Sequence, residues 1–483
     1  MKRAIVMAVL SLTASTAGAQ QVLTLDQCIG IALENNYGIQ RSEQNKIGAE
    51  ASLEAAHDSF KSRASLSLET PRLYETVNEQ FDWSLQLPRW IQEGSTRYLG
   101  RLSITQPLPT DGNISLTSTL YRRDLFSNLS GVRQDRDEYS STLTLSFQQP
   151  LFTANSMKLS LRRAELNYEL ANRRYQRAKW ELVYNVTSAF YNLVKAARQV
   201  EIDQERAKQS RNSYEMAKLK YNSGLIPEVE ALQLEVDLAL NEATLSSSQA
   251  NLEQAEDLLK QALGLDLQES IKVVTRVEYR PLKVDMAKAI EEGFKNRLEI
   301  REYTIQRELS ELDVKDTERL SEFKGAISAF YNLDGKGDEF EQAIDTDGFN
   351  KNRGVTLSFS VPLWDWGKNR AEVEAAQANL KIAELNLEEE RKIVERQIRD
   401  AVRRLEEAAN RVEILKASVE VAQKSYDITR QRFEAGAVTS ERLMDAQIAL
   451  ARAKKDDLEA LIDYQLALAD LKRVTMSDEV GFE

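Results

Sequence analysis

The chain has 483 residues, with 64 basic and 76 acidic side chains and a formal net charge of −12 at pH 7. Its acidic balance argues against nucleic acid as a partner. The single cysteine, Cys28, excludes an internal disulfide, and the single histidine, His57, excludes histidine-based metal clusters and catalytic dyads. The length gives room for two halves of roughly 200 to 240 residues.

The first nineteen residues, 1–19, have the pattern of a secretory signal peptide. Lys2 and Arg3 give a basic start, residues 4–12 an apolar core, and Ala17 to Ala19 a small-residue cleavage site. After this segment no run of about eighteen apolar residues occurs, so we expect no transmembrane helix. A secreted chain of this kind can still enter a membrane as a β-barrel.

Each half of the chain opens with a helical pattern. Residues 24–27 have the spacing of a capping box, and apolar residues recur behind them at helical spacing. A similar opening begins at Asp285, 261 residues later. We therefore expect helices at 24–60 and 285–320.

Strands follow these helices. Apolar residues alternate with Ser and Thr at 141–147 and 355–361, a pattern typical of strands with two unlike faces. A soluble, half-buried sheet would give the same alternation. Aromatic residues at the strand ends favour an outer-membrane sheet, because aromatic girdles flank the lipid-facing band of such barrels. These aromatic residues are Tyr121, Tyr139, Phe147, Phe152, Trp364 and Trp366.

The strand region of the first half, 61–150, is longer than that of the second half, 325–361. The extra material contains a possible hairpin, 99–106 and 113–121, turning at the segment from Pro109 to Gly112. This hairpin either forms an elaborated outer loop or adds two strands to the sheet. The sequence leaves both possibilities open.

Two junctions between a strand and a helix occur at one constant offset. Pro150 and Pro362 lie 212 residues apart, and so do Gly224 and Gly436. An offset that holds over about ninety residues indicates an internal duplication. We expect two structural repeats, 20–278 and 279–476, followed by a C-terminal tail at 477–483.

Very long helical patterns follow both junctions, at 154–222 and 368–434. A helix of 65 residues spans roughly 100 Å at 1.5 Å per residue. A solvated coiled coil is one interpretation, but a conduit across an envelope compartment has more use for such length. Each pattern ends near a glycine, the expected left-handed stop of a helix. Return helices are then expected at 228–264 and 440–474.

Nothing in the sequence indicates an enzyme. We find no phosphate-binding loop, nucleophile elbow or zinc spacing, and the acidic run Glu388 to Glu390 is interpreted as a solvated helix face. We interpret Cys28 as a structural thiol on an apolar helix face and His57 as structural or solvated. No catalytic residue, metal or cofactor is expected.

Together these motifs resemble the TolC-type outer-membrane efflux channel family, the outer membrane efflux proteins. The resemblance covers Gln20 to about Met476 and is carried by the Leu-Thr-Leu-Asp start at 23–26, the Pro-Leu-Phe and Pro-Leu-Trp junctions and the Tyr/Phe-x-x-Gly turns. It implies a mixed membrane protein with an internal two-fold repeat, a long α-helical periplasmic tunnel and a transmembrane β-barrel. In such a homotrimer each protomer gives four of twelve strands. Open strand edges independently require several chains to share a barrel.

The resemblance also implies a function. The protein would be a passive export conduit of the cell outer membrane, with a long periplasmic extension, in a tripartite efflux or type I secretion system. A periplasmic adaptor (membrane fusion protein) and an inner-membrane pump of the RND, ABC or a similar class would open it. The competing interpretation is a secreted structural coiled-coil scaffold, soluble and elongated. The cargo, whether drug, metal or protein, cannot be derived from the sequence.

The resemblance finally implies site residues. Asp445 matches one of two acidic gate positions, Arg442 occupies the other, and Glu230 keeps the acid of the first turn. We hypothesise that Arg442 and Glu230 provide a substitute contact in the closed state. The family's tip arginine falls on Val438. The expected tip and adaptor contacts are Tyr221, Gly224, Leu225, Ile226, Phe433, Gly436, Ala437 and Val438, and the expected membrane-interface aromatics are Phe147, Phe152, Trp364 and Trp366.

Overall fold

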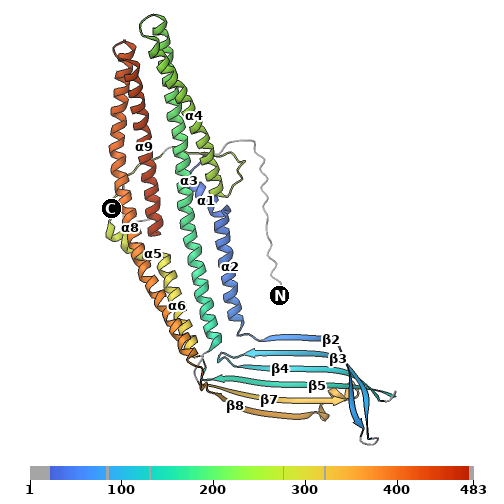
Figure 1. Cartoon of the computed structure of the whole chain (residues 1–483). Helices are drawn as coiled ribbons and strands as arrows, with labels where there is room; N and C mark the ends of the chain where they lie inside the picture. Colours follow the sequence, from blue (N-terminus) through green and yellow to red (C-terminus); the bar gives the residue numbers. More distant parts are fainter. Residues whose placement is uncertain are drawn as a thin grey trace. The chain divides into compact units, whose positions relative to one another are not determined.

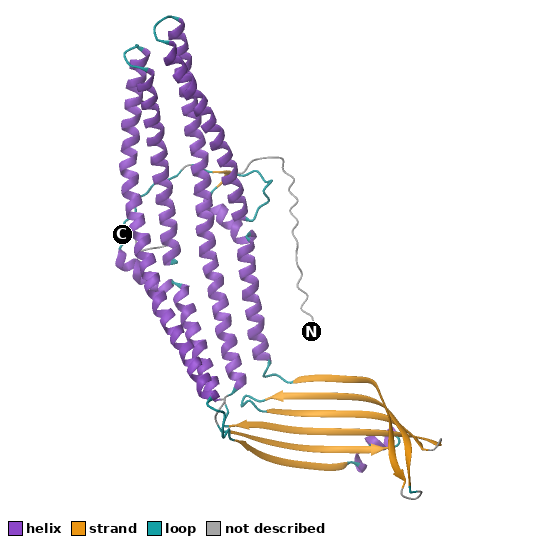
Figure 2. Cartoon of the chain, in the orientation of Figure 1, coloured by secondary structure: helices purple, strands orange, loops and turns teal. Residues whose placement is uncertain are grey.

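The computed structural model describes residues 22–82, 86–129, 132–153, 155–275, 277–319 and 323–477. The expected signal peptide, 1–19, and all of the expected tail except its first residue lie outside the described residues. The chain divides into two compact units. The helical unit comprises the described residues within 1–45, 173–301 and 388–483, and the sheet unit those within 46–172 and 302–387. Figure 2 distinguishes the helices from the strands of the sheet.

Long helices with short connections make up most of the helical unit (Figure 1). Two helices have 67 residues each and are followed by helices of 36 residues each. In the described part of the chain, no helix combines the length and the apolar character needed to cross a membrane. The helices are α1 (Leu25–Asn35), α2 (Tyr37–Asp58), α3 (Ser156–Asn222), α4 (Glu228–Leu263), α5 (Met286–Asn296), α6 (Leu298–Glu318), α8 (Lys368–Glu434) and α9 (Ser440–Thr475).

The helix expected at 24–60 is interrupted at Asn36, which has extended backbone angles (φ −67°, ψ 124°). Its side-chain oxygen accepts a hydrogen bond from the Gly38 N–H at 2.8 Å and so caps α2. Its side-chain nitrogen donates to the Ala262 carbonyl, near the end of α4, at 3.0 Å. Asn36 thus ends one helix, starts the next and holds the end of a third.

The helix expected at 285–320 is interrupted in the same way at Arg297 (φ −62°, ψ 117°). The Arg297 guanidinium donates to the Val474 carbonyl, near the end of α9, at 3.1 Å. Asn36 and Arg297 are 261 residues apart, whereas Ala262 and Val474 are 212 apart. These are the two offsets of the repeated sequence pattern, so both halves fasten the end of a return helix to a helix break.

Three apolar clusters form the core of the helical unit. One surrounds Cys28 and joins α1, α3, α4 and α9. The second joins α5, α8 and α9 around Tyr464. The third surrounds Phe433, near the connections from α3 to α4 and from α8 to α9. A short parallel ladder, β1 (Val22–Leu23) with β6 (Lys272–Val273), adds to this unit.

Besides parts of α2, α3, α6 and α8, the sheet unit contains a six-stranded sheet in the order β2-β3-β4-β5-β7-β8, with every neighbouring pair antiparallel (Figure 1). A short helix, α7 (Phe340–Ile344), and a 3₁₀ turn, η2 (Thr346–Gly348), connect the last two strands. The strands are β2 (Arg63–Asp82), β3 (Leu87–Pro107), β4 (Asn113–Leu129), β5 (Val132–Leu151), β7 (Lys324–Gly337) and β8 (Asn350–Ser360).

The extra hairpin of the first half belongs to this sheet. Leu99 of β3 lies opposite Tyr121 of β4, and both strands also pair with their outer neighbours, β2 and β5. The segment therefore adds strands and is not an outer loop. The resemblance implies four strands per chain, but the sheet has six. The inserted residues keep the Ser/Thr alternation and pair with a neighbouring strand on each side.

Candidate channel-forming elements

The alternation of residues gives the sheet one hydrocarbon face and one hydroxyl face. On the hydrocarbon face, Leu66 lies opposite Leu102 and Leu116 opposite Leu145. On the other face, hydroxyl groups meet across strands, with Ser115 and Ser146 at 2.6 Å. A lipid-facing apolar side and a polar lumen side alternate in this way in outer-membrane strands.

Aromatic rings gather at the end of the sheet where β5 and β8 lead into α3 and α8. The Phe323 ring lies 5.4 Å from the rings of both Phe152 and Phe359. Trp364 and Trp366 form an edge-to-face pair at 5.4 Å, and both are largely exposed. Phe323 and Phe359 were not among the expected interface residues, although an aromatic residue next to a strand end was the signal for the others.

Phe147 lies inside the sheet and not with this aromatic group. It is opposite Ile114 on one side and Ala329 on the other, within the hydrocarbon face. Phe147 was expected at the membrane interface because Pro150, three residues later, was interpreted as the end of the strand. The strand continues through that proline to Leu151, which moves the end of the sheet beyond Phe147.

A second aromatic level crosses the sheet at Tyr139, thirteen residues before Phe152. The Arg122 guanidinium lies 5.6 Å from the Tyr139 ring, and that of Arg97 lies 5.2 Å from the Tyr121 ring. At the strand tilt of about 35 to 45° in outer-membrane barrels, thirteen strand residues cover roughly 30 to 35 Å of height, close to the hydrocarbon core of about 30 Å. The two aromatic levels thus bracket a band of membrane thickness.

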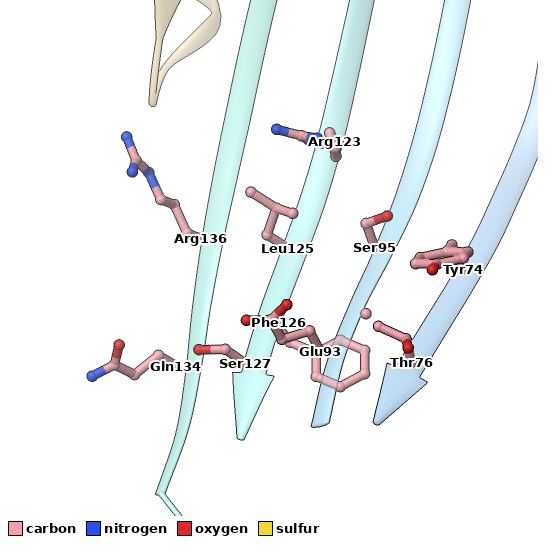
Figure 3. A pocket seen from close by; sticks show the side chains of 11 residues that line it. Tyr74, Thr76, Glu93, Ser95, Arg123, Leu125, Phe126, Ser127, Gln134 and Arg136 are labelled. Carbon is pink, nitrogen blue, oxygen red and sulfur yellow. The ribbon is translucent and has the colours of Figure 1, made fainter. Parts of the chain in front are cut away.

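Beyond the tyrosines, β2 to β5 continue as a charged extension. Arg123 pairs with Glu138, and Arg136 pairs with Asp338 at 3.0 Å. A hollow of about 440 Å³ lies on this extension (Figure 3). Gly94 makes room there, because a Cβ at this position would overlap the Phe126 ring. Both arginines at the hollow already have carboxylate partners.

The connection from α3 to α4 is a tight helix stop at Gly224, whose φ is +72°. The Leu225 N–H donates to the Lys220 carbonyl at 2.9 Å, and the Gly224 N–H donates to the Tyr221 carbonyl at 2.8 Å. These two bonds form the Schellman motif. The chain therefore reverses within a few residues and exposes Leu225.

The connection from α8 to α9 has the same geometry. Gly436 has a φ of +73°, the Ala437 N–H donates to the Arg432 carbonyl at 2.8 Å, and the Gly436 N–H donates to the Phe433 carbonyl at 3.0 Å. The Phe433 side chain is only 1% exposed, and the Lys220 ammonium lies 4.4 Å from its ring. Phe433 thus packs beneath the turn, whereas the turn itself is accessible.

The expected gate residues lie at the start of the return helices. Glu230 is in the first turn of α4 and half-buried, and Arg442 and Asp445 are exposed near the start of α9. No ion pair joins Arg442 to either acid within the described part of one chain. A contact that the sequence did not suggest links the two return helices instead, from the Ser440 hydroxyl to the Gln233 side-chain oxygen at 3.3 Å.

Buried polar groups join α3 to the two return helices, a few turns from the connections at Gly224 and Gly436. The Ser210 hydroxyl of α3 donates to Asp237 of α4 at 2.6 Å, and the Asn241 amide donates to Ser210 at 2.7 Å. Gln447 of α9 donates to the Ser213 hydroxyl of α3 at 3.1 Å. These residues were not predicted from the sequence, because a buried Ser or Asn in a polar helix has the same spacing as a solvated one.

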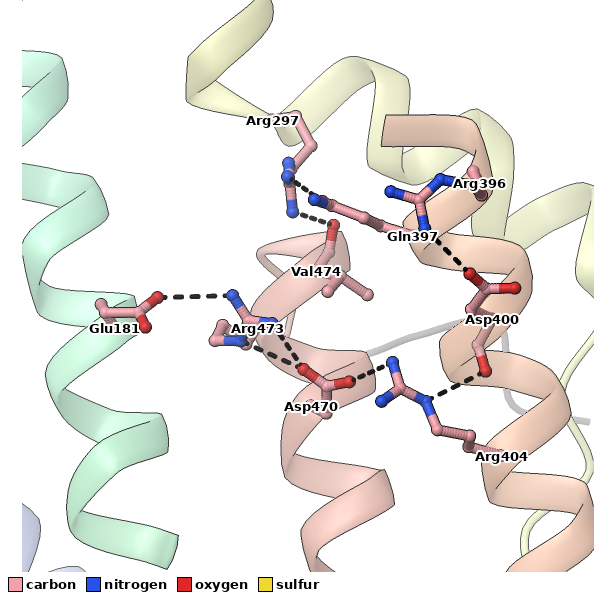
Figure 4. Close-up of polar contacts among 9 residues, drawn as sticks. All are labelled: Glu181, Arg297, Arg396, Gln397, Asp400, Arg404, Asp470, Arg473 and Val474. Carbon is pink, nitrogen blue, oxygen red and sulfur yellow. Dashed lines mark hydrogen bonds and ion pairs between the residues drawn. The ribbon is translucent and has the colours of Figure 1, made fainter. Parts of the chain in front are cut away.

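An ionic network fastens the C-terminal end of α9 (Figure 4). Arg473 donates to Asp470 at 2.6 Å and to Glu181 of α3 at 3.4 Å, and Arg404 of α8 pairs with Asp470 at 3.0 Å. Arg297 donates to Gln397 of α8 in addition to the Val474 carbonyl. The end of α9 is therefore held by side chains of α3 and α8 as well as by the α5–α6 break.

Two charged side chains near this network, Arg297 and Glu390, are partly shielded from solvent. Burial lowers the pKa of Arg297, and the nearby Glu299 carboxylate opposes this effect. Burial also raises the pKa of Glu390, and the negative charge of Glu299 raises it further. The ionised form of Glu390 is thus disfavoured in the folded chain.

Cys28 is fully buried in the first apolar cluster, and burial raises the pKa of its thiol to about 11. The thiol is therefore protonated and shielded at neutral pH. His57 lies in the last turn of α2. The described residues include no group of three or more His, Cys, Asp or Glu side chains that could hold a metal ion.

The fold and its two-faced sheet define an outer-membrane channel class, and comparison with known proteins identifies the family. The profile of the family described as "Outer membrane efflux protein" matches residues 28–265 and 329–475. The chain belongs to this family, and the resemblance derived from the sequence motifs is confirmed. No curated protein sequence matches the chain.

Solved structures of similar fold include two outer-membrane channels and one outer-membrane protein. CmeC of Campylobacter jejuni is 14% identical, with a TM-score of 0.71 over 95% of this chain and 86% of that channel. VceC of Vibrio cholerae is 14% identical, with a TM-score of 0.69 over 93% and 95%. MtrE of Neisseria gonorrhoeae, solved in its open state, is 15% identical, with a TM-score of 0.66 over 93% and 88%. At these identities the likeness establishes the fold alone.

Proposed function

We propose that this protein is a passive export channel of the outer membrane in which three copies share one barrel and one helical tunnel. The observation that carries the proposal is a six-stranded sheet with one hydrocarbon face and two unpaired edges. Lipid does not tolerate open backbone edges, and transmembrane barrels have at least eight strands. One chain is therefore insufficient, and family membership supports a homotrimer.

An inner-membrane pump and a periplasmic adaptor supply the energy and open the channel in this proposal. The 67-residue helices α3 and α8 each measure roughly 100 Å along their axes, a length suited to an envelope compartment. The accessible turns at Gly224 and Gly436 are the proposed adaptor contacts, with Tyr221, Leu225, Ile226, Ala437 and Val438 beside them. The proposal covers small-molecule efflux and type I protein secretion alike.

We propose Glu230, Arg442 and Asp445 as the groups that close the periplasmic end. Since Arg442 has no ion pair with either acid in a single chain, the proposed latch between Arg442 and Glu230 joins neighbouring copies. An exposed ion pair contributes only about 0 to 1 kcal/mol. Three symmetric copies of the latch together would still favour the closed state measurably.

Conductance of purified protein in planar lipid bilayers tests the proposal. We expect channels with low conductance in the wild type and a several-fold higher open probability in Arg442→Ala. Arg442→Lys should stay near the wild type because it keeps the charge. Arg452→Ala, which removes another exposed arginine of α9, is the matched control and should also leave gating unchanged.

Two results would contradict the proposal at different points. Equal conductance of Arg442→Ala and wild type would remove the latch and leave the channel. Complete absence of channel activity, together with protein that stays soluble without detergent, would remove the channel itself in favour of a secreted scaffold.

A further inference from the structure

The two outer strands of the sheet carry its most exposed apolar side chains. The edge residues Leu68 and Val355 are 74% and 79% exposed, whereas Leu102 and Leu143 of inner strands are 43% and 37% exposed. All four lie in the band between the aromatic levels. The difference arises because β2 and β8 each lack a neighbour on one side. Each edge therefore has room for one more strand.

The strand count makes the two edges compatible with each other. Six antiparallel strands place β2 and β8 in opposite directions. When β8 of one copy lies beside β2 of the next, the new pair is also antiparallel, as throughout bacterial outer-membrane barrels. An odd number of strands would force a parallel pair at this position.

The helix-side ends of neighbouring strands are aligned within the chain. Lys324 pairs with Ser360, and Arg63 pairs with Thr105, two residues from the end of β3. Three-fold symmetry places the same end of every copy at the same membrane depth. An aligned seam therefore sets Arg63 of one copy opposite Ser360 of the next.

This alignment also matches the two faces. Apolar residues have even numbers in β2 and odd numbers in β8, so only every second register keeps the hydrocarbon face continuous. Setting Arg63 opposite Ser360 places Leu66 opposite Leu357 and Leu68 opposite Val355. The seam ends just beyond Glu69, because the ladder is irregular between Glu69 and Arg72 and Pro71 has no N–H to donate.

We propose that three copies of this chain, joined at β8–β2 seams, close an eighteen-stranded barrel. This inference rests on the proposed trimeric channel and changes its barrel, since the family resemblance implied twelve strands. Barrel diameter grows roughly linearly with strand number, so the opening is about 1.5 times as wide as that of a twelve-stranded barrel. Barrels of 16 to 18 strands enclose an aqueous channel, which fits bulky solutes at the outer end.

Disulfide cross-linking in isolated outer membranes tests the seam. Leu66→Cys and Leu357→Cys are combined in one chain, oxidised with copper phenanthroline and denatured by boiling in detergent without reductant. The two positions lie on opposite edges of the sheet, so a bond between them joins different copies. We expect covalent species of two and three chains and none larger.

The matched control is Ser67→Cys with Leu357→Cys, whose side chains face opposite sides of the sheet and should not cross-link. Ala64→Cys or Leu68→Cys with Leu357→Cys tests registers shifted by two residues. The native Cys28 is buried and should give no cross-link in the unmodified chain. Electron microscopy of the wild type provides a count of strands that no substitution can disturb.

The outcomes separate the seam from the function. Covalent species limited to two chains, or twelve strands in end-on projections, would overturn the eighteen-stranded barrel. So would a trimer in which none of the three pairs cross-links, and in each of these three cases the channel function stands. A protein that is monomeric in water without detergent would overturn the proposed function itself.

Discussion

At the scale of single residues, two glycines with the same backbone conformation have different roles. Gly224 and Gly264 have φ values of +72° and +73°. A Cβ at Gly224 would meet nothing within 4 Å, whereas at Gly264 it would lie 2.6 Å from the Asn35 carbonyl oxygen. The first glycine only permits a turn, and the second also permits close contact between the ends of α1 and α4.

We therefore predict that Gly264→Ala destabilises the protein more than Gly224→Ala. The left-handed conformation alone costs alanine about 1 to 2 kcal/mol, and at Gly264 the Asn35 backbone must move as well. Thermal unfolding of the detergent-solubilised protein, followed by far-ultraviolet circular dichroism, measures both. Equal shifts in Tm would show that the contact with Asn35 contributes nothing.

The left-handed glycines could be predicted from the sequence, but the partners of some residues could not. Gly224 and Gly436 follow long helical patterns, where a stop of this kind is common. Asn36 interrupts a helix because it also binds the carbonyl of Ala262, which is distant in the sequence. Phe433 was expected among the tip and adaptor contacts but is buried, since burial depends on neighbouring helices that spacing does not reveal.

At the scale of elements, the end of α9 depends on a buried arginine. Arg297 forms an ion pair with Glu299 at 3.1 Å and donates to the Val474 carbonyl. The pKa of Glu390 of α8 is also affected by Glu299. Burial raises this pKa, and the negative charge of Glu299 raises it further. A carboxyl whose pKa is higher in the folded than in the unfolded chain favours folding at low pH and opposes it above the folded pKa.

This sign leads to a prediction for Glu390→Gln. The variant should have a higher Tm than the wild type at pH 7, because it removes a disfavoured charge. The gain should vanish near pH 4, close to the ordinary glutamate pKa of about 4.3, because Glu390 is then largely protonated in the wild type. Glu388→Gln, on the exposed face of the same helix, is the control and should change neither value. A Tm gain that is independent of pH would contradict this account.

The long helices were predicted with ends within two residues of those observed, because their periodicity is strong over many turns. The number of strands was left open. The inserted segment 99–121 alternates as a strand pair does, but alternation does not specify which strands become neighbours. That the inserted strands pair with β2 and β5 is known only from the register of the complete sheet.

At the scale of the whole molecule, one chain is an incomplete part of a shared barrel in the proposed channel. The sheet has a hydrocarbon face of membrane height and open edges at β2 and β8. An exposed hydrocarbon face is unfavourable in water, and open strand edges are unfavourable in lipid. Association of copies within a membrane places the hydrocarbon face in lipid and pairs the open edges. A rod-like soluble scaffold would need neither feature.

The most direct measurement is the mass of the protein extracted from outer membranes, determined by light scattering with the detergent contribution subtracted. The account predicts a complex of three chains that requires detergent and separates into single chains only on heating in sodium dodecyl sulfate. A single chain that remains dispersed in buffer without any detergent would contradict it.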